Sequence, residues 1–315
     1  MFDRAMRHYR SILLIIYLIC ILVIFIIIPM LKPNNHFDGL QRKLPRQSSS
    51  WNIDLPVLIQ PAVLKLNSII LMCVTSAPHN LNRRQAIRET WGTTSSIQVV
   101  FLLGVSANHN ARELQYDINF EAQAYGDVLQ NNFVDNYRNL TLKSIALVQW
   151  AKKSRWPARR VVVKTDDDVF IHTPRLLSYL DHFTDGNLYG RQLTNAKPLR
   201  CRKAVCNHTE VTKDEYFPDT YPPYLQGLFY IFSETALNRI HEHMFDPAFL
   251  FIEDLYITGL VAGRAGVERC AMPKENVINS EKPDHRTLYR LKKDLLVQHH
   301  CDPTKLRQYW KHIHS

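Results

Sequence analysis

The residues best suited to chemistry are three consecutive aspartates, Asp166, Asp167 and Asp168, which follow an apolar run that ends at Lys164. Ionised carboxylates placed side by side repel one another, so each raises the pKa of its neighbours. A divalent cation relieves this repulsion, because Mg²⁺ and Mn²⁺ prefer oxygen ligands and also bridge phosphate oxygens. The triplet therefore indicates a metal and phosphate site. The alternatives are a solvated turn or the N-cap of a helix near Pro174.

Two arginines form a second candidate group. Arg84 and Arg88 lie four residues apart in the segment from Leu81 to Trp91, whose spacing is helical, so they share one face. Guanidinium groups pair well with phosphates. The pair is a candidate for an anionic ligand, and the alternative is a salt-bridged surface helix. Trp91 is assigned to the core.

The elements that must position these residues alternate between strands and helices. Continuous apolar runs predict strands at 68–75, 98–104, 127–129 and 160–164. Helical spacing predicts helices at 81–91, with Asn82 as its cap, and at 112–125 and 140–153. Such alternation indicates an α/β domain with a largely parallel sheet, in which ligands gather at the carboxyl ends of the strands. The triplet follows such an end.

The N-terminus predicts the compartment. The run from Ser11 to Leu31 is apolar and uncharged, and at about 1.5 Å per residue it spans a hydrocarbon core of roughly 30 Å. We interpret it as a retained signal anchor, with a cleaved signal peptide as the alternative. Residues 1–10 are then a cytosolic tail, the Pro- and Ser-containing residues 32–66 a stem, and residues 67–315 a luminal domain.

Sequons and cysteines also favour a luminal domain. Asn139 and Asn207 each begin a glycosylation sequon, and Asn207 lies in the more loop-like stretch. A short disulfide between Cys201 and Cys206 is plausible, with a zinc site that includes His208 as the alternative. The cysteines beyond the span are odd in number, so at least one thiol is free or paired elsewhere; they are Cys73, Cys201, Cys206, Cys270 and Cys301.

The charge of the chain indicates an anionic partner. The formal net charge is +10 and the pI is near 9.3. Lys and Arg are scattered, without the dense clusters typical of nucleic-acid binding, so we expect no nucleic acid. A nucleotide diphosphate accounts for positive charge equally well.

Several separated motifs follow one another along the chain. They are Arg83-Arg84-Gln85-Ala86-Ile87-Arg88-Glu89-Thr90-Trp91, Phe101-Leu102-Leu103-Gly104, Glu121-x3-Tyr125-Gly126-Asp127-Val128, Asp135-x-Tyr137-x-Asn139-Leu140-Thr141-x-Lys143, Lys164-x-Asp166-Asp167-Asp168-Val169-Phe170, Tyr221-Pro222-Pro223-Tyr224-x2-Gly227 with Tyr230, and Glu253-Asp254-Leu255-Tyr256-x2-Gly259. Together they resemble the β-1,3-glycosyltransferase family, which includes β-1,3-galactosyltransferases and β-1,3-N-acetylglucosaminyltransferases. The resemblance covers roughly residues 68 to 312.

The resemblance implies a GT-A-like, Rossmann-type fold behind a single N-terminal transmembrane helix. It also implies a UDP-sugar donor, Mn²⁺, and inversion at the anomeric carbon to give a β-1,3 link to a glycan acceptor. We place UDP-galactose ahead of UDP-N-acetylglucosamine. The tail, anchor and stem are similar to those of type II proteins of the Golgi membrane.

On the donor side, the resemblance makes Asp168 a metal ligand. It implies that Asp166 contacts the donor ribose or a water molecule bound to the metal. His299 completes the metal and diphosphate site, with its neighbour His300 as the alternative. The remaining residues assigned to the donor are Arg84, Arg88, Asp135, Lys143 and Asp167.

On the acceptor side, the resemblance makes Asp254 the general base that takes the hydroxyl proton, ahead of Glu253. Asp254 follows an apolar run, where burial would make it more basic, and it would also cap a helix predicted at 255–265. Tyr224, Gly227 and Glu253 are assigned to the acceptor; a Pro-rich loop packed on the core is the alternative for the Tyr-Pro turn.

One departure concerns the acceptor. Members of the family usually carry a Lys-Trp element before the Tyr-Pro turn, and residues 199–207 contain no Trp. Acceptor recognition is therefore expected to differ. The competing hypotheses are a metal-dependent nucleotide hydrolase and a non-catalytic glycan-binding relative.

Overall fold

The computed structural model describes residues 51–62, 68–154, 161–201, 207–280 and 287–315. The chain divides into two compact units, residues 1–44 and 45–315, and the described residues all belong to the second. Within these ranges no helix has the length and apolar character needed to cross a membrane. The predicted tail and anchor lie outside the described residues.

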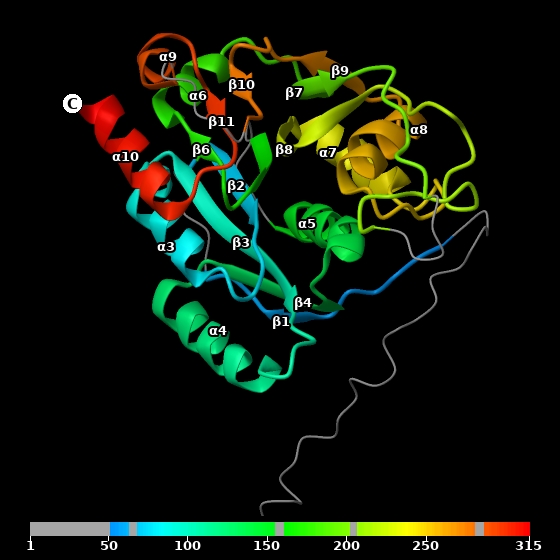
Figure 1. The fold of residues 1–315 in the computed structure, drawn as a ribbon, viewed down its shortest axis with the longest axis horizontal. Helices are drawn as coiled ribbons and strands as arrows, with labels where there is room; N and C mark the ends of the chain where they lie inside the picture. The colour runs from blue at the N-terminus through cyan, green and yellow to red at the C-terminus, as the bar shows by residue number, and fades with distance from the viewer. Residues whose placement is uncertain (1–50, 63–67, 155–160, 202–206, 281–286) are drawn as a thin grey trace, which may run out of the picture. The chain divides into compact units, whose positions relative to one another are not determined.

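A mixed sheet forms the centre of the second unit (Figure 1). The described residues contribute eight strands in the order β1-β4-β3-β2-β5-β8-β7-β9. The pairs among β4, β3, β2 and β5 are parallel, and β8 lies antiparallel to both β5 and β7. The strands are β1 Val57–Ile59, β2 Ile70–Thr75, β3 Ile97–Val105, β4 Val128–Val134, β5 Val161–Asp166, β7 Asn187–Leu193, β8 Tyr224–Phe232 and β9 Glu268–Ala271.

Helices cover both faces of this sheet (Figure 1). Successive side chains of a strand point to opposite faces, so in β2 Leu71 and Cys73 pack into one core cluster and Ile70, Met72 and Val74 into the other. The first cluster includes α5 Leu140–Lys153, α7 Glu234–His243, the π-helix η5 Leu255–Val261 and α8 Ala262–Arg264. The second includes α3 Leu81–Glu89, η3 Trp91–Thr93, α4 Ala111–Tyr125, α6 Thr173–Leu180, α9 Thr287–Lys293 and α10 Pro303–His314.

The strand order places a topological switch point at the triplet. The chain runs from β2 through β3 to β4 on one side, and α5 then returns it to β5 on the other side of β2. Ligands of open α/β sheets bind where the strand order reverses, beyond the carboxyl ends of the strands. Thr75, the last residue of β2, pairs in register with Asp166, the last residue of β5.

The predicted elements are confirmed with small shifts at their ends. The helix at 140–153 has the predicted bounds, and the predicted strands correspond to β2, β3, β4 and β5. The prediction of Asn82 as a cap was wrong, because α3 begins at Leu81 and its N-cap is Asn80. Trp91 is fully buried, as predicted, and its indole N–H donates to the carbonyl of Val169 at 3.0 Å.

A small second sheet brings the C-terminal segment to the triplet. β6 Phe170–Ile171 pairs antiparallel with β11 Val297–Gln298, which pairs parallel with β10 Val277–Ile278. Beyond β11, the amide of Cys301 donates to the carbonyl of Asp168 at 2.8 Å. His299 and His300 are therefore held beside the last aspartate of the triplet.

Residues 51–62, which the sequence assigned to the stem, pack against the rest of the second unit. Trp51 is 6% exposed, and its indole N–H lies 2.7 Å from the carbonyl of Pro247 and 3.1 Å from the hydroxyl of Tyr256. β1 pairs antiparallel with β4 at the edge of the sheet. An indole donor and a strand edge both need partners, which explains why this Pro-containing segment is ordered.

Candidate active site

The three aspartates of the triplet face different partners. Asp167 is buried and accepts hydrogen bonds from Ser76 at 2.7 Å, Asn80 at 2.8 Å and Arg83 at 3.0 Å. It joins the end of β5 to the start of α3. The assignment of Asp167 to the donor is therefore not supported by the geometry, because both of its oxygens already bind the protein.

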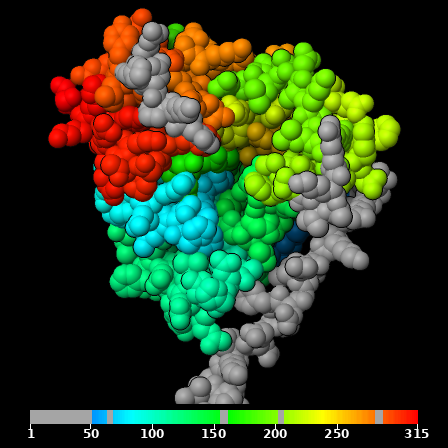
Figure 2. Space-filling view, viewed as in Figure 1, coloured from blue at the N-terminus to red at the C-terminus, as the bar shows by residue number. Residues whose placement is uncertain are grey.

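Asp166 and Asp168 are more exposed than Asp167. Asp166 accepts hydrogen bonds from Thr75 at 2.6 Å and Lys164 at 2.7 Å through one oxygen, Oδ1. Asp168 binds Arg83 at 3.3 Å and His299 at 3.1 Å. Figure 2 shows this face of the molecule hollowed between the cyan region that includes α3 and the yellow-green region that precedes β8.

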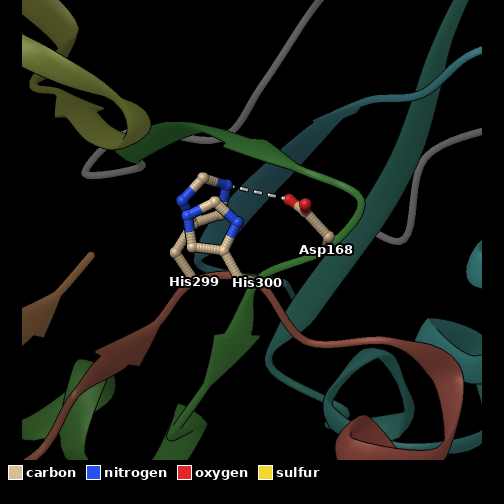
Figure 3. A group of neighbouring side chains, drawn as sticks. All are labelled: Asp168, His299 and His300. Atoms are coloured by element: carbon tan, nitrogen blue, oxygen red, sulfur yellow. Dashed lines mark ion pairs between the residues drawn. The ribbon is translucent and has the colours of Figure 1, made fainter. Parts of the chain in front are cut away.

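Asp168, His299 and His300 form a group that could hold a metal ion (Figure 3). One ligand atom from each residue lies within 4.8 Å of the others. Burial would raise the pKa of Asp168, but the hydrogen bond and charge of His299, with the charge of Arg83, outweigh it and lower that pKa. The carboxylate is therefore ionised, as a metal ligand must be.

The orientation of His299 suits metal binding. Its Nδ1 lies 2.8 Å from the Oδ1 of Asn279, and its Nε2 faces Asp168. An amide oxygen accepts only, so Nδ1 donates to Asn279, and Nε2 is left to donate to Asp168 or, with that proton displaced, to bind a cation. His300 has a φ of 57°, an uncommon conformation for a residue with a side chain, and its ring lies 3.8 Å from that of His299.

Asp254 lies at the end of η5 nearest β8. Its Oδ2 accepts from the amide of Gly227 at 2.9 Å, and its Oδ1 accepts from the amide of Leu255 at 2.8 Å. Burial, followed by the charge of Glu253, raises the pKa of Asp254 to about 7. Asp254 also caps the helix, as predicted, although the segment 255–265 is a π-helix followed by the short α8. A group poised near neutral pH suits proton transfer.

Glu253 binds neighbouring side chains of the protein. It is buried, and it accepts hydrogen bonds from Ser144 at 2.6 Å and from Tyr230, while Lys164 lies 3.3 Å from its second oxygen. These contacts hold Glu253 inside the protein, and its role toward the acceptor stays a prediction.

Lys164 was missed as a site residue. Its side chain is 4% exposed, and its ammonium group reaches Asp166, the carbonyl of Gly227 at 2.5 Å and Glu253. The signal was a lysine near the end of an apolar strand, two positions before the first aspartate of the triplet. A buried lysine needs partners, so this position already implied a nearby carboxylate.

Gly227 and Tyr224 of β8 lie near Asp254. A Cβ atom added at Gly227 would lie 3.2 Å from both the Cβ and an oxygen of Asp254, so a side chain there would press against the carboxylate. Tyr224 is half-buried, and burial together with the charge of Asp254 raises the pKa of its phenol. The roles of both residues toward the acceptor stay predictions.

The two arginines of α3 bind protein carboxylates. Arg84 is 1% exposed and pairs with Glu121 at 2.7 Å. Arg88 pairs with Glu121 at 2.6 Å and Asp127 at 2.8 Å, and its guanidinium carbon lies 4.0 Å from the centre of the Tyr125 ring. Their shared face points inward, so the structure does not support a direct contact between Arg84 and a phosphate.

Replacing Arg84 with Met should destabilise the protein. The guanidinium also donates to Ser76, Ala77 and Pro78, so it holds the loop after β2. Loss of one partner from a buried ion pair costs about 3–5 kcal/mol. Chemical denaturation should report that loss, and Arg112→Met, on the exposed face of α4, should change stability by less than about 0.5 kcal/mol. Equal midpoints for the two variants would contradict this role of Arg84.

Asp135 and Lys143 form a further buried pair at 2.9 Å. Asp135 also accepts from the amide of Gly104 at 2.8 Å, and Lys143 donates to the carbonyl of Ser76 at 2.8 Å. The pair thus links β3, α5 and the loop after β2, beside the triplet. Its contact with a nucleotide stays a prediction.

The sequons and cysteines differ in their surroundings. Asn139 is half-buried and donates to the carbonyl of Val134 at 2.8 Å, whereas Asn207 is exposed. Cys201 is disulfide-bonded, which excludes the zinc alternative for its thiolate, and its predicted partner Cys206 lies outside the described residues. The free cysteines among the described residues are Cys73, Cys270 and Cys301.

The fold and the site together define an α/β domain with an Asp–His group that could hold a metal ion and a separate buried carboxylate. The family model "Galactosyltransferase" matches residues 82–273, so the chain belongs to that family.

Curated relatives carry three different donor names. Human "Beta-1,3-galactosyltransferase 4" is 33% identical over 77% of this chain and 72% of its own length. "UDP-GalNAc:beta-1,3-N-acetylgalactosaminyltransferase 1" of Sus scrofa is 34% identical over 61% of this chain, which spans 59% of that relative. Human "Lactosylceramide 1,3-N-acetyl-beta-D-glucosaminyltransferase" is 29% identical over 77% of this chain and 65% of its own length.

Solved structures resemble the chain more weakly. Mouse xyloside xylosyltransferase 1 in its apo form matches with a TM-score of 0.34 and 10% identity, over 74% of this chain and 96% of that chain. A galactosyltransferase in complex with donor and acceptor sugar analogues matches with a TM-score of 0.37 and 12% identity, over 78% of this chain and 95% of that chain.

Proposed function

We propose that the protein is an inverting β-1,3-glycosyltransferase that moves a hexose, galactose in our assignment, from a UDP-sugar to a hydroxyl of a glycan acceptor. The observation that carries the proposal is a pair of carboxylate sites with different electrostatics. One is the ionised Asp168 beside His299, and the other is Asp254, whose pKa of about 7 suits a base.

In a single displacement, Asp254 serves the attacking hydroxyl and the Asp168 site serves the leaving diphosphate. Asp254 accepts the proton of the acceptor hydroxyl while that oxygen forms a bond to the anomeric carbon. The bond between the anomeric carbon and the diphosphate oxygen breaks at the same time, and the diphosphate leaves with the bonding electron pair. Attack from the face opposite the leaving group inverts the anomeric carbon.

The donor side suits a divalent cation such as Mn²⁺. Asp168 and His299 offer a carboxylate oxygen and an imidazole nitrogen, and His300 is the third member of the group. Carboxylate oxygen suits Mn²⁺ and imidazole suits several transition metals. When bound, the ion offsets the negative charge of the diphosphate. Asp166 remains our candidate for the ribose or the metal's water shell.

The location follows from the N-terminal segment. A span at residues 11–31 would make the protein a single-pass type II protein of the Golgi membrane, with residues 1–10 in the cytosol. The exposed Asn207 and the bonded Cys201 are consistent with a luminal domain. We propose Asn207 as the glycosylated sequon, and Asn139 as unmodified because its side chain is engaged.

The donor is assigned by the name of one relative, and other relatives favour a second candidate. The family model and the human relative of 33% identity are named for galactose. The relatives of 34% and 29% identity are named for N-acetylhexosamines, so a β-1,3-N-acetylhexosaminyltransferase is the alternative.

A donor panel tests the proposal. We expect the full-length protein with Mn²⁺ to transfer one sugar from UDP-galactose, UDP-N-acetylglucosamine or UDP-N-acetylgalactosamine to a galactose- or hexosamine-terminated acceptor. The linkage of the product is read by NMR. Hydrolysis of the nucleotide without acceptor preference would indicate a hydrolase, and binding without turnover a glycan-binding protein; either result would contradict the proposal.

A further inference from the structure

We propose that Lys164 and Glu253 form a buried positioning pair that sets the place and the basicity of Asp254 relative to the donor side. The inference rests on the proposed function and extends it, because neither residue touches substrate in this assignment. It assigns Lys164 to both halves of the site and moves Glu253 from acceptor binding to control of the base.

The contacts of Lys164 join the two sides of the site. Its ammonium group lies 2.7 Å from Asp166 at the end of β5, 2.5 Å from the carbonyl of Gly227 in β8, and 3.3 Å from Glu253. An ammonium group has three donors, and these are three acceptors. The residue whose carbonyl Lys164 holds, Gly227, is also the residue whose amide holds Asp254 at 2.9 Å.

The second member of the pair is held equally well. Ser144 of α5 and Tyr230 of β8 donate to one oxygen of Glu253, and Lys164 lies at the other. The side chains of Lys164 and Glu253 are 4% and 7% exposed. A buried, mutually bonded network of this kind favours one arrangement of its side chains.

The pair also acts on the charge of Asp254, in opposite directions. Glu253 adjoins Asp254 and favours its protonated form, whereas Lys164 favours its ionised form. The other titratable groups near Asp254 are the phenols of Tyr137, Tyr221, Tyr224 and Tyr230. These phenols carry no charge near neutral pH. After burial, which is the largest cause of the raised pKa, Glu253 and Lys164 are the charged groups that act on Asp254.

The test is a direct titration of the Asp254 carboxyl by ¹³C NMR in full-length protein labelled at aspartate, with Asp254→Asn to assign the signal. We expect Lys164→Met to raise the pKa of Asp254 by about one unit and Glu253→Gln to lower it by a similar amount. The double variant should fall between them. A purely structural role would not give shifts of opposite sign.

Turnover provides the second readout. Misplacement of a catalytic group by about 1 Å can cost about 10²-fold in rate. Lys164→Met should therefore lower kcat by about 10²-fold. The matched control is Lys152→Met, because Lys152 is an exposed lysine of α5 that bonds Asn238. Its titration curve and kcat should equal those of the wild type.

The outcomes distinguish failure of the positioning-pair proposal from failure of the proposed function. If Lys164→Met fails to fold, Glu253→Gln alone still tests the proposal, since it keeps the shape of the side chain and removes its charge. An unmoved Asp254 titration in Glu253→Gln overturns the proposal, whatever the turnover. Absence of transfer in the wild type with every donor overturns the proposed function instead, and leaves the titration result valid.

Discussion

Asp254→Asn should lower kcat by about 10²–10⁴-fold, which is the usual contribution of a general base. The amide has nearly the shape of the carboxylate but cannot take a proton from the acceptor hydroxyl. UDP affinity should change little, because the contacts of Asp254 are with the amides of Gly227 and Leu255 and not with the Asp168 side. Single-turnover transfer and calorimetry with UDP and Mn²⁺ measure the two quantities.

The wild-type pH profile checks the same assignment. A carboxyl group with a raised pKa is protonated as the pH falls through that pKa, so kcat should fall below about pH 7 and approach a tenfold loss per pH unit. The control is Asp246→Asn, because Asp246 is an exposed aspartate that pairs with His243. Unchanged kcat in Asp254→Asn, or an acid limb that survives in it, would remove Asp254 from the role of base.

Asp168→Ala should weaken Mn²⁺-dependent UDP binding by at least about 10²-fold, since even outer-shell changes cost about 10–100-fold in metal affinity. The variant removes the carboxylate of the metal group, whereas Asp167 keeps its own partners Ser76 and Asn80. Calorimetry with and without Mn²⁺ separates the metal-dependent part. Binding of UDP without metal should be similar in the two proteins.

Variants of His299 and His300 should also weaken Mn²⁺-dependent UDP binding, to different degrees. His299→Ala should reproduce most of the loss, because its Nε2 faces Asp168 and its Nδ1 is held by Asn279. His300→Ala should cost less. Asp181→Ala, at the exposed end of α6, is the control for loss of an aspartate. Wild-type affinity in Asp168→Ala, or full activity in a strong chelator, would exclude a metal at this group.

The helices and parallel strands could be predicted because their signals are local. The helix Leu140–Lys153 has apolar residues at helical spacing, and β2 is a continuous apolar run, so neither depends on distant segments. The place of the triplet follows from the same logic, since it ends the strand Val161–Asp166. The antiparallel insertion of β8 between β5 and β7 has no such signal, because it depends on long-range pairing.

The orientation of charged side chains was harder to predict. Spacing shows that Arg84 and Arg88 share a face, but it does not show that the face points toward the buried Glu121. The same limit applies to Glu253, which differs from Asp254 by one position and yet points to Ser144 and Tyr230. His299 was identified through family resemblance alone, since a histidine 131 positions after Asp168 has no local link to it.

Trp51 determines where a shortened form of the protein should begin. A fragment that starts at residue 67 would lack the Trp51 indole, which contacts Pro247 and Tyr256; Tyr256 is two positions after Asp254. The fragment would also lack β1, so the outer edge of β4 would have no partner strand. Bare strand edges promote self-association. A fragment that begins upstream of Trp51 is the form expected to remain monodisperse during purification and crystallisation.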